Sequence, residues 1–454
     1  MIRLRAFLLF SSVLSVSTAA LIACSSDDPR ESFVETPDSA STPEASLPPV
    51  VEESDGGTSD AEADAAPPPK PDYDASDEAV ICATTPCATQ LVAGESHFCA
   101  LLDDGTIRCW GDNSRGALGI GDIDGGADAG FRPTAVVGVS NATQISAAEF
   151  ATCARNADGG VLCWGGNRQG QLGLREAPAL VDTLRHPTPT DVALDAEVAR
   201  VDVGHRSVCA LGAGGDAYCW GGNDQKQLAR PDAGAITAGG PGAADLDGFQ
   251  VTRTGGGLTS VFGLTNDGRL LGWGAVSGRE GSINPDPVPF PIPTLSKVTS
   301  FAAGPAHACA IADGEVFCWG TNRQGALGTG LPDMERFPTR TGVVTDEKEK
   351  AFPQQVAVSA NTTCVRMTDG SIQCTGDDRL GQLGRGTSGL LTAFFGKATA
   401  FEEHAVQVAT SNSATCALVQ GGKVVCWGGN PNGELGQGTR GNSAQLTPVT
   451  VVFQ

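Results

Sequence analysis

Residues 97–111 have the sequence HFCALLDDGTIRCWG, in which two cysteines flank a short stretch that contains an Asp-Gly pair. Apolar and polar residues alternate on both sides of the glycine, which is typical of two antiparallel strands joined by a turn. If Cys99 and Cys109 lie opposite each other, residues 103–105 form the loop between the strands. A three-residue hairpin loop commonly ends on a residue in the left-handed region, which glycine adopts without steric cost. The stretch therefore predicts a β-hairpin.

This hairpin belongs to a unit that recurs along the chain. Its closing Trp-Gly returns at intervals of 46 to 56 residues, and one copy has Thr in place of Trp. The seven positions are Trp110, Trp164, Trp220, Trp273, Trp319, Thr375 and Trp427. Repeats of about 40 to 55 residues are typical of propeller blades or solenoid units. We therefore expect an all-β repeat domain with seven units.

Six of the seven copies carry a cysteine pair that spans the hairpin. These pairs are Cys99–Cys109, Cys153–Cys163, Cys209–Cys219, Cys309–Cys318, Cys364–Cys374 and Cys416–Cys426. The fifth copy is one residue shorter, and a two-residue turn at Asp313-Gly314 would keep its cysteines opposite each other. The fourth copy loses both cysteines together, with Phe262 and Gly272 in their places.

The compensated turn length and the joint loss both favour disulfide bonds within the hairpins. One alternative is that the cysteines are buried and free, because free cysteine behaves as a small apolar residue. Zinc is a second alternative, although two facing cysteines lack the further ligands of a tetrahedral site. We predict six hairpin disulfides, which require an oxidising compartment.

The first 24 residues resemble the signal peptide of a bacterial lipoprotein. Arg3 and Arg5 precede an apolar stretch that is too short for a transmembrane helix. The stretch ends in residues 21–24, LIAC, which resemble a lipobox and imply lipid attachment to Cys24. The alternative is an ordinary signal peptide cleaved near Ala19 or Ala20. Because Ser rather than Asp follows the cysteine, we expect an outer-membrane lipoprotein that faces the periplasm or the cell surface.

Residues 25–78 contain sixteen Asp or Glu, two Lys or Arg and nine Pro. Such a segment has too little apolar surface to offset the entropy of ordering, and it predicts a disordered acidic tether. Binding of a cation or a partner by the tether is the alternative. We assign residues 79–454 to the repeat domain. By elimination, Cys82 and Cys87 at its entry are predicted to bond to each other.

The charge of the chain excludes nucleic acid as an expected partner. The net charge is −22, of which residues 1–24 carry +2 and residues 25–78 carry −14, which leaves −10 for the repeat domain. Nucleic-acid binding needs Lys and Arg to displace counterions. No G-x-S-x-G elbow, H-E-x-x-H motif or phosphate loop is present. We therefore expect no catalytic residue, no cofactor and a monomer.

One acidic stretch is a weak candidate for a metal site. Asp122, Asp124 and Asp128 lie at spacings that loosely resemble a calcium-binding loop. The glutamate that closes an EF-hand loop is missing, so a polar surface loop is the alternative.

The segment Trp-Gly-x-Asn-x-x-Gly-x-Leu-Gly stands at residues 110–119, 164–173, 319–328 and 427–436. Together with the upstream Gly94-x-x-His97, it resembles the repeat of the regulator of chromosome condensation family, over roughly residues 88–454. The resemblance implies a seven-bladed β-propeller with four antiparallel strands in each blade. His97 and His307 occupy the family's histidine position, and we interpret both as structural. Residues 447–453 resemble the strand that closes a blade, and we expect them near residues 90–92.

The resemblance also bears on function, because members of this family work mainly through protein contacts. A secreted bacterial relative, the β-lactamase-inhibitory propeller, binds an enzyme in this way. We therefore expect an extracytoplasmic platform that binds a protein or a polymer. The alternative is a propeller enzyme, a lyase or hydrolase acting at the mouth of the channel. Nucleotide exchange on a GTPase, known for one member, does not suit an exported chain.

Overall fold

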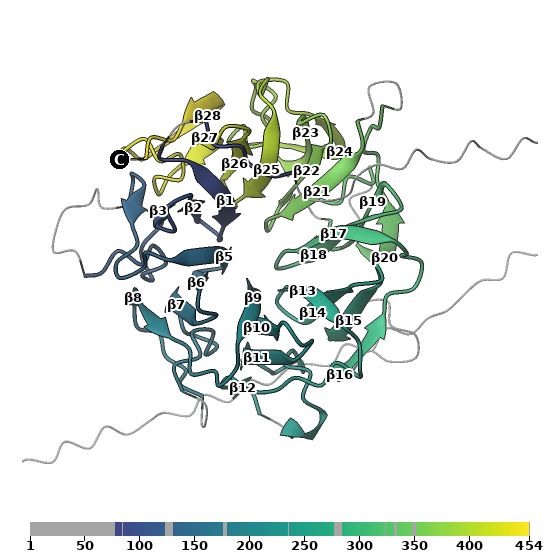
Figure 1. Cartoon of the computed structure of the whole chain (residues 1–454). Coiled ribbons are helices and arrows are strands. Elements are labelled where there is room, and N and C mark those ends of the chain that lie inside the picture. Colours follow the sequence, from purple (N-terminus) through teal and green to yellow (C-terminus); the bar gives the residue numbers. More distant parts are fainter. Residues whose placement is uncertain are drawn as a thin grey trace, which may run out of the picture. The chain divides into compact units, whose positions relative to one another are not determined.

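The computed structural model describes residues 78–453 except 84, 123–129, 176–178, 235, 277–283, 323, 331–333 and 347–350. Within the compact unit of residues 71–454, seven four-stranded antiparallel sheets surround a common centre (Figure 1). The prediction of an all-β, seven-bladed propeller is confirmed. In the described part of the chain, the single helix is a 3-10 turn at Pro231–Ala233, and no helix there is long and apolar enough to cross a membrane.

Each blade is one contiguous segment of four strands. Blade 1 contains β1 (Ala88–Ala93), β2 (His97–Leu102), β3 (Ile107–Gly111) and β4 (Thr134–Ala135). Blade 2 contains β5 (Ala142–Ala148), β6 (Ala151–Asn156), β7 (Val161–Gly165) and β8 (His186–Asp191). Blade 3 contains β9 (Val198–Val203), β10 (Ser207–Gly212), β11 (Ala217–Gly222) and β12 (Ala238–Gly239). Blade 4 contains β13 (Val251–Gly256), β14 (Ser260–Thr265), β15 (Leu270–Gly274) and β16 (Asp286–Pro291).

The remaining three blades follow the same plan. Blade 5 contains β17 (Val298–Ala303), β18 (His307–Ala312), β19 (Glu315–Gly320) and β20 (Glu335–Arg340). Blade 6 contains β21 (Pro353–Val358), β22 (Thr362–Met367), β23 (Ile372–Asp377) and β24 (Leu391–Lys397). Blade 7 contains β25 (Ala405–Thr410), β26 (Ala414–Val419), β27 (Lys423–Asn430) and β28 (Gly441–Thr450).

The hairpin of every blade is formed by its second and third strands, in the register that the sequence predicts. Cys99 lies opposite Cys109, and Phe262 lies opposite Gly272 in the blade without cysteines. Gly105 has a φ of 78°, as expected for the last residue of a three-residue loop. In the shorter fifth copy Asp313 and Gly314 both have positive φ, 49° and 75°, which is the signature of a type I′ turn.

Neighbouring blades are joined by the recurring tryptophan of the repeat, which is buried in the core between them. Its indole N–H donates to a backbone carbonyl in the Gly-x-Leu loop of the preceding blade. The donor–acceptor pairs are Trp164–Ala117 (2.9 Å), Trp220–Gln171 (2.8 Å), Trp273–Gln227 (2.8 Å), Trp427–Gln382 (3.0 Å) and Trp110–Glu434 (2.8 Å). In blade 6 the hydroxyl of Thr375 donates to the carbonyl of Gly325 at 2.9 Å and so keeps the contact.

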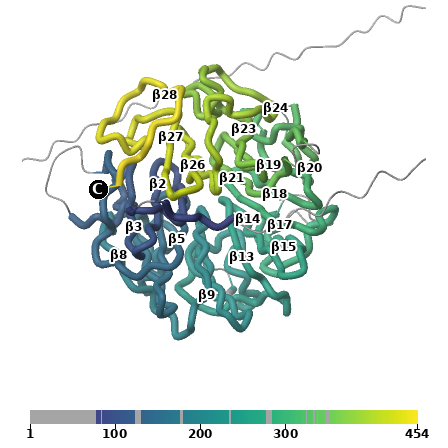
Figure 2. Tube along the Cα trace, turned by 45° about the horizontal axis from the view of Figure 1, so that its top comes forward, coloured from purple at the N-terminus to yellow at the C-terminus, as the bar shows by residue number. Residues whose placement is uncertain are grey.

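Among the described strands, no sheet mixes strands from the two ends of the chain. The ring is closed instead by main-chain hydrogen bonds, such as the one from Asn412 to Glu95, by side chains and by a shared core. Blade 7 lies beside blade 1 in both views (Figures 1 and 2). The bond from Trp110 to Glu434 joins them, and Val451 shares a buried cluster with Ala88 and Leu91. The expectation that the C-terminal residues 447–453 lie near residues 90–92 therefore agrees with the core, although β28 pairs with β27 rather than with β1.

Candidate functional site at the central channel

The first strand of each blade is innermost, and the seven first strands surround a central channel of about 470 Å³ (Figure 1). Two ends of this channel can be distinguished by the connections that surround them. We call the end that carries the turns between second and third strands the turn face, and the opposite end the loop face. On the turn face, the main chain that enters blade 1 is held by blade 7, since the N–H of Ala88 donates to Gly422 at 3.0 Å.

Four blades place a glutamine at the third position of the innermost strand. An innermost strand is a sheet edge, so some of its N–H and C=O groups lack a partner within its own blade. A glutamine amide offers both a donor and an acceptor and can satisfy one group of each kind. The Nε2 of Gln90 donates to the carbonyl of Ile145, and the N–H of Ile145 donates to Oε1 of Gln90, both at 2.9 Å.

The same bridge recurs around the ring and closes it. Gln144 binds the main chain of Val201 in blade 3, and Gln355 binds that of Val408 in blade 7. Gln407 accepts from the N–H of Leu91 at 2.9 Å, which connects the last blade to the first. We call these four side chains, Gln90, Gln144, Gln355 and Gln407, the glutamine bridges.

Blades 3, 4 and 5 depart from this pattern. Blade 5 has Ser300 at the third position, and its Oγ accepts from the N–H of Val356 at 3.5 Å, whereas blades 3 and 4 have arginine there. Arg200 and Arg253 stand at the third position, and both line the channel. The bridge from blade 3 to blade 4 is made instead by Asp202, two residues further along β9. Its Oδ2 accepts from the N–H of Thr254 at 2.8 Å. Arg200 Nε donates to Oδ1 and Oδ2 of Asp202 at 2.8 and 3.0 Å.

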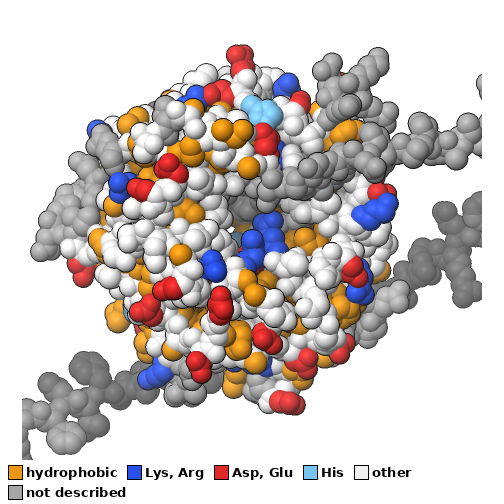
Figure 3. Space-filling view, in the orientation of Figure 1, with side chains coloured by type: hydrophobic (Ala, Val, Ile, Leu, Met, Phe, Trp, Pro, Cys, Tyr) orange, Lys and Arg blue, Asp and Glu red, His pale blue; other side chains and the backbone are white. Residues whose placement is uncertain are grey.

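Both arginines lie in the middle of their six-residue strands. Arg200 is paired with Leu211 and Arg253 with Leu264, and each leucine is the next-to-last residue of its strand before the turn. The guanidinium of Arg253 lies 5.5 Å from the centre of the Phe301 ring in blade 5, within the range of a cation–π contact. Figure 3 shows basic side chains inside the hollow at the centre of the ring, whereas acidic side chains are spread over the surface around it.

The loop face of the channel carries a different set of titratable groups. Glu95 accepts from Asn412 Nδ2 at 2.9 Å, and the carboxylate of Glu149 accepts from Gln171 Nε2 at 3.1 Å. Burial raises the pKa of Glu149, and the nearby charge of Glu95 raises it further. Burial lowers the pKa of His205 to about 4, so this imidazole is neutral at pH 7.

The two histidines that we interpreted as structural lie in the interfaces between blades. His97 Nε2 and Thr152 Oγ1 are 2.9 Å apart, and His307 Nε2 and Thr363 Oγ1 are 2.8 Å apart. Thr152 Oγ1 also donates to the carbonyl of Ala117, so it accepts from His97. Burial lowers the pKa of both histidines to about 4.

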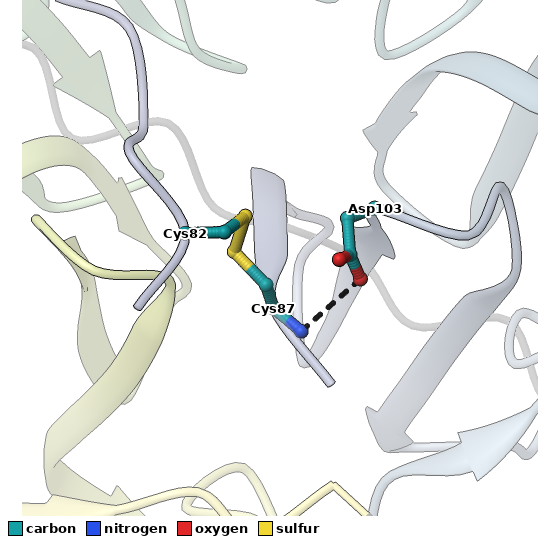
Figure 4. Close-up of side chains that lie close together, drawn as sticks. All are labelled: Cys82, Cys87 and Asp103. Atoms are coloured by element: carbon teal, nitrogen blue, oxygen red, sulfur yellow. Dashed lines mark hydrogen bonds between the residues drawn. A yellow bond between two sulfur atoms is a disulfide. The ribbon is translucent and has the colours of Figure 1, made fainter. Parts of the chain in front are cut away.

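The structure joins all seven predicted cysteine pairs as disulfides. Their Cα–Cα distances are 4.1 to 4.2 Å in the six hairpins and 5.7 Å for Cys82–Cys87. Asp103 lies beside Cys82 and Cys87, and its Oδ1 accepts from the N–H of Cys87 at 3.3 Å (Figure 4). Because the two sulfurs are bonded to each other, this group does not offer the thiolates that a metal site needs.

The other predicted site residues are mostly beyond the part of the chain that the structure describes. Cys24 and the tether up to residue 77 lie outside the described residues, as do Asp124 and Asp128. Asp122 is described and exposed.

The entry to the domain binds to the turn face of blades 6 and 7. Glu78 accepts from His404 Nε2 at 2.9 Å and from Gln420 Nε2 at 3.0 Å. Its Oε2 is also 3.6 Å from Nη1 of Arg366, which is fully buried in β22. The blade 7 turn contains Gly421-Gly422, and a Cβ at Gly422 would collide with Cys87, so glycine there makes room for the entering chain.

Comparisons with known proteins identify the repeat. The family model described as "Regulator of chromosome condensation (RCC1) repeat" matches residues 88–117, 142–171 and 405–434, and a second model of the same description matches residues 158–211 and 313–366. The matched segments contain the four glutamine positions and the tryptophans Trp110, Trp164, Trp319 and Trp427. The protein is thus a seven-bladed propeller, and the matched segments are RCC1 repeats.

Similar curated proteins and solved structures support this assignment. The chain is 29% identical over 256 residues to the ultraviolet-B receptor UVR8 of Arabidopsis thaliana, covering 55% of this chain and 56% of that protein. It is 28% identical over 265 residues to the probable E3 ubiquitin-protein ligase HERC6 of Homo sapiens, covering 55% of this chain and 25% of that protein. The chain thus spans from a quarter to little more than half the length of these relatives.

Among solved structures, Prp20p from Saccharomyces cerevisiae matches with a TM-score of 0.63 and 17% identity, over 81% of this chain and 88% of that one. That protein has binding properties to Gsp1p and histones. Human WBSCR16 matches with a TM-score of 0.51 and 23% identity, over 60% of this chain and 70% of that one. At these identities the likeness establishes the fold alone.

Proposed function

We propose that the protein is a rigid, extracytoplasmic binding platform, anchored by a lipid on Cys24 to the outer membrane and facing the periplasm or the cell surface. The observation that carries this proposal is the set of seven disulfides, because such bonds persist in oxidising compartments. A similar curated protein is a receptor, and Prp20p, which has a similar fold, binds Gsp1p and histones. Loops on a rigid scaffold are the usual place for recognition.

The expected partner is a protein or a cell-wall polymer, bound without a cofactor by a monomeric propeller. The acidic balance of the repeat domain disfavours nucleic acid. We propose no catalytic role. The histidines His97 and His307 are buried between blades, where each binds a threonine hydroxyl of the neighbouring blade.

Capture of partners tests the platform, and a mass measurement tests the anchor. Full-length protein made under oxidising conditions serves as the bait for intact cells and growth medium, and the reduced, unfolded protein is the control. A partner enriched by the folded protein alone supports the platform, and its absence in protein and glycan fractions refutes it. For the anchor, the mature N-terminus should begin at a diacylglyceryl-modified Cys24, and a Cys24→Ala variant should lose the modification. A mature chain cut near Ala20 would contradict the anchor while leaving the platform untouched.

A further inference from the structure

The disulfide between Cys82 and Cys87 differs from the six hairpin disulfides in its exposure to solvent. Every cysteine of the hairpin disulfides is at most 2% exposed, and Cys87 is buried as well, whereas Cys82 is exposed. Thiol–disulfide exchange requires a thiolate to reach one sulfur of the bond, so burial protects the hairpin disulfides. Cys82 therefore offers the point of attack that a reductant in solution can reach.

The chain on both sides of Cys82 lies against the hairpin turn of blade 7. We call residues 78–87, except residue 84, the entry strap. The N–H of Ile81 donates to Oε1 of Gln420 at 2.7 Å, and the N–H of Ala83 donates to the carbonyl of Gly421 at 3.3 Å. Both donors are direct neighbours of the exposed cysteine, so a change in its bonding acts on both contacts.

The two cysteines are held in different ways. Cys87 is fixed by Asp103, because its N–H donates to Oδ1 at 3.3 Å and its carbonyl accepts from the N–H of Asp103 at 2.9 Å (Figure 4). Cys87 also fills the space over Gly422, where a Cβ would collide with its Sγ. The disulfide ties Cys82 to this fixed point. Breaking the bond thus leaves Cys87 in place and releases the Cys82 end of the entry strap.

We propose that Cys82–Cys87 is a redox-modification site, at which an extracytoplasmic dithiol protein opens the entry strap while the six hairpin disulfides stay intact. A thiolate of the dithiol protein attacks Sγ of Cys82, forms a mixed disulfide with it and expels Sγ of Cys87, which takes up a proton. The second thiolate of the dithiol protein then attacks the protein's own sulfur in the mixed disulfide, and Cys82 leaves and is protonated. The dithiol protein ends as a disulfide, and two electrons have passed to the propeller.

Opening the entry strap uncovers part of the turn face and leaves the blades closed. Gln420 and Gly421 are half-buried beneath the closed strap, and its departure frees their polar groups for a partner. Ala88, the first residue of β1, keeps its own bond to Gly422 at 3.0 Å, so blade 1 stays attached to blade 7. The inference takes the extracytoplasmic location from the proposed function and goes beyond it, because it specifies how this face is switched.

The test treats folded full-length protein with graded dithiothreitol and, in parallel, with a thioredoxin-type dithiol protein and its reductase. Free thiols are alkylated with iodoacetamide and located by peptide mapping, which separates Cys24 from the disulfide cysteines. We expect Cys82 and Cys87 to be alkylated about a hundredfold faster than any hairpin cysteine. Hydrogen exchange of the amides of Ile81 and Ala83 should rise about tenfold on this selective reduction and fall again when the bond is re-formed.

Two matched variants separate opening of the entry strap from general destabilisation. Cys82→Ala/Cys87→Ala should show fast exchange of the two strap amides without any reductant. The control Cys309→Ala/Cys318→Ala removes a hairpin disulfide instead, and it should leave the strap amides as protected as in the wild type.

Four results would overturn the proposal. These are alkylation of a hairpin cysteine as early as Cys82, resistance of the Cys82–Cys87 bond to the dithiol protein, unchanged exchange of the strap amides after its reduction, and failure of the bond to re-form on oxidation. If the Cys82→Ala/Cys87→Ala variant does not fold, alkylation and exchange of the wild type still decide. These measurements use the purified protein alone, so their failure would leave the platform standing, whereas failure to capture a partner would leave the redox site standing.

Discussion

Replacing Glu78 with alanine should destabilise the propeller, although Glu78 precedes its first strand. Glu78 lies 3.6 Å from the guanidinium of Arg366, a side chain that is completely buried, and it also accepts from His404 and Gln420. Removing one partner of a buried ion pair costs about 3 to 5 kcal/mol, because the other charge stays buried without compensation. The Glu78 side chain is 31% exposed, so water replaces part of its effect. We expect a loss of about 2 kcal/mol.

The chain itself supplies the rescuing substitution. At the position of Arg366, five other blades have an aliphatic residue: Leu101, Leu211, Leu264, Ile311 and Leu418. Replacing both members of a buried ion pair by apolar groups is often nearly neutral. The double variant Glu78→Ala/Arg366→Leu should therefore unfold within about 1 kcal/mol of the wild type, which makes the two substitutions strongly non-additive.

Urea unfolding of the oxidised protein, followed by tryptophan fluorescence, measures all four members of this cycle. A Glu78→Ala variant as stable as the wild type would refute the reasoning. So would a double variant that is less stable than Glu78→Ala alone, because Arg366 would then be stabilising without its partner.

Three further predictions concern the blades. Burial holds the pKa of His307 at about 4, below its unfolded value of about 6.5. Between these values the unfolded chain binds more protons, so stability should fall as the pH drops from 6.5 to 4. His307→Gln should reduce this pH dependence of the urea midpoint, and an unchanged slope would contradict the prediction. Replacing Cys309 and Cys318 by alanine should lower the free energy of unfolding by up to roughly 3 kcal/mol in the same assay. The fold should be retained, because blade 4 forms the same hairpin without a disulfide. Loss of the native circular dichroism spectrum would contradict this prediction. Trp110→Phe leaves the carbonyl of Glu434 without its indole donor and should lower the free energy of unfolding by about 1 to 3 kcal/mol. Trp164→Phe should have a similar effect within the ring. A much smaller effect at Trp110 would show that other contacts close the ring.

The hairpins could be read from the sequence because their determinants are local. The glycine-containing turns determine the register of the two strands, and the cysteine pairs indicate which residues lie opposite each other. In the fifth blade the turn at Asp313-Gly314 is one residue shorter, and Cys309 and Cys318 still lie opposite each other. Loss of both cysteines at Phe262 and Gly272 points to the same pairing from the opposite direction. The count of seven followed from the spacing of Trp-Gly, but four strands per blade followed only from the family resemblance.

The residues that line the channel were not predicted, because their role depends on contacts between blades. Gln90 and Gln144 are ordinary polar residues of an alternating strand in sequence, and their role requires the neighbouring innermost strand. A signal was available, since alignment of the copies upstream of the cysteines places glutamine at this position in four of them. Arg200, Arg253 and Ser300 are then the three exceptions. Arg366 could likewise have been recognised as an arginine at a mostly aliphatic position, but its partner Glu78 was assigned to the tether.

Affinity capture with full-length oxidised protein from intact cells and their medium tests the central claim most directly. The account predicts that the folded protein enriches a specific protein or wall polymer that the reduced, unfolded protein does not retain. Enrichment of the same material by both forms, or of nothing by the folded form, would contradict a binding platform.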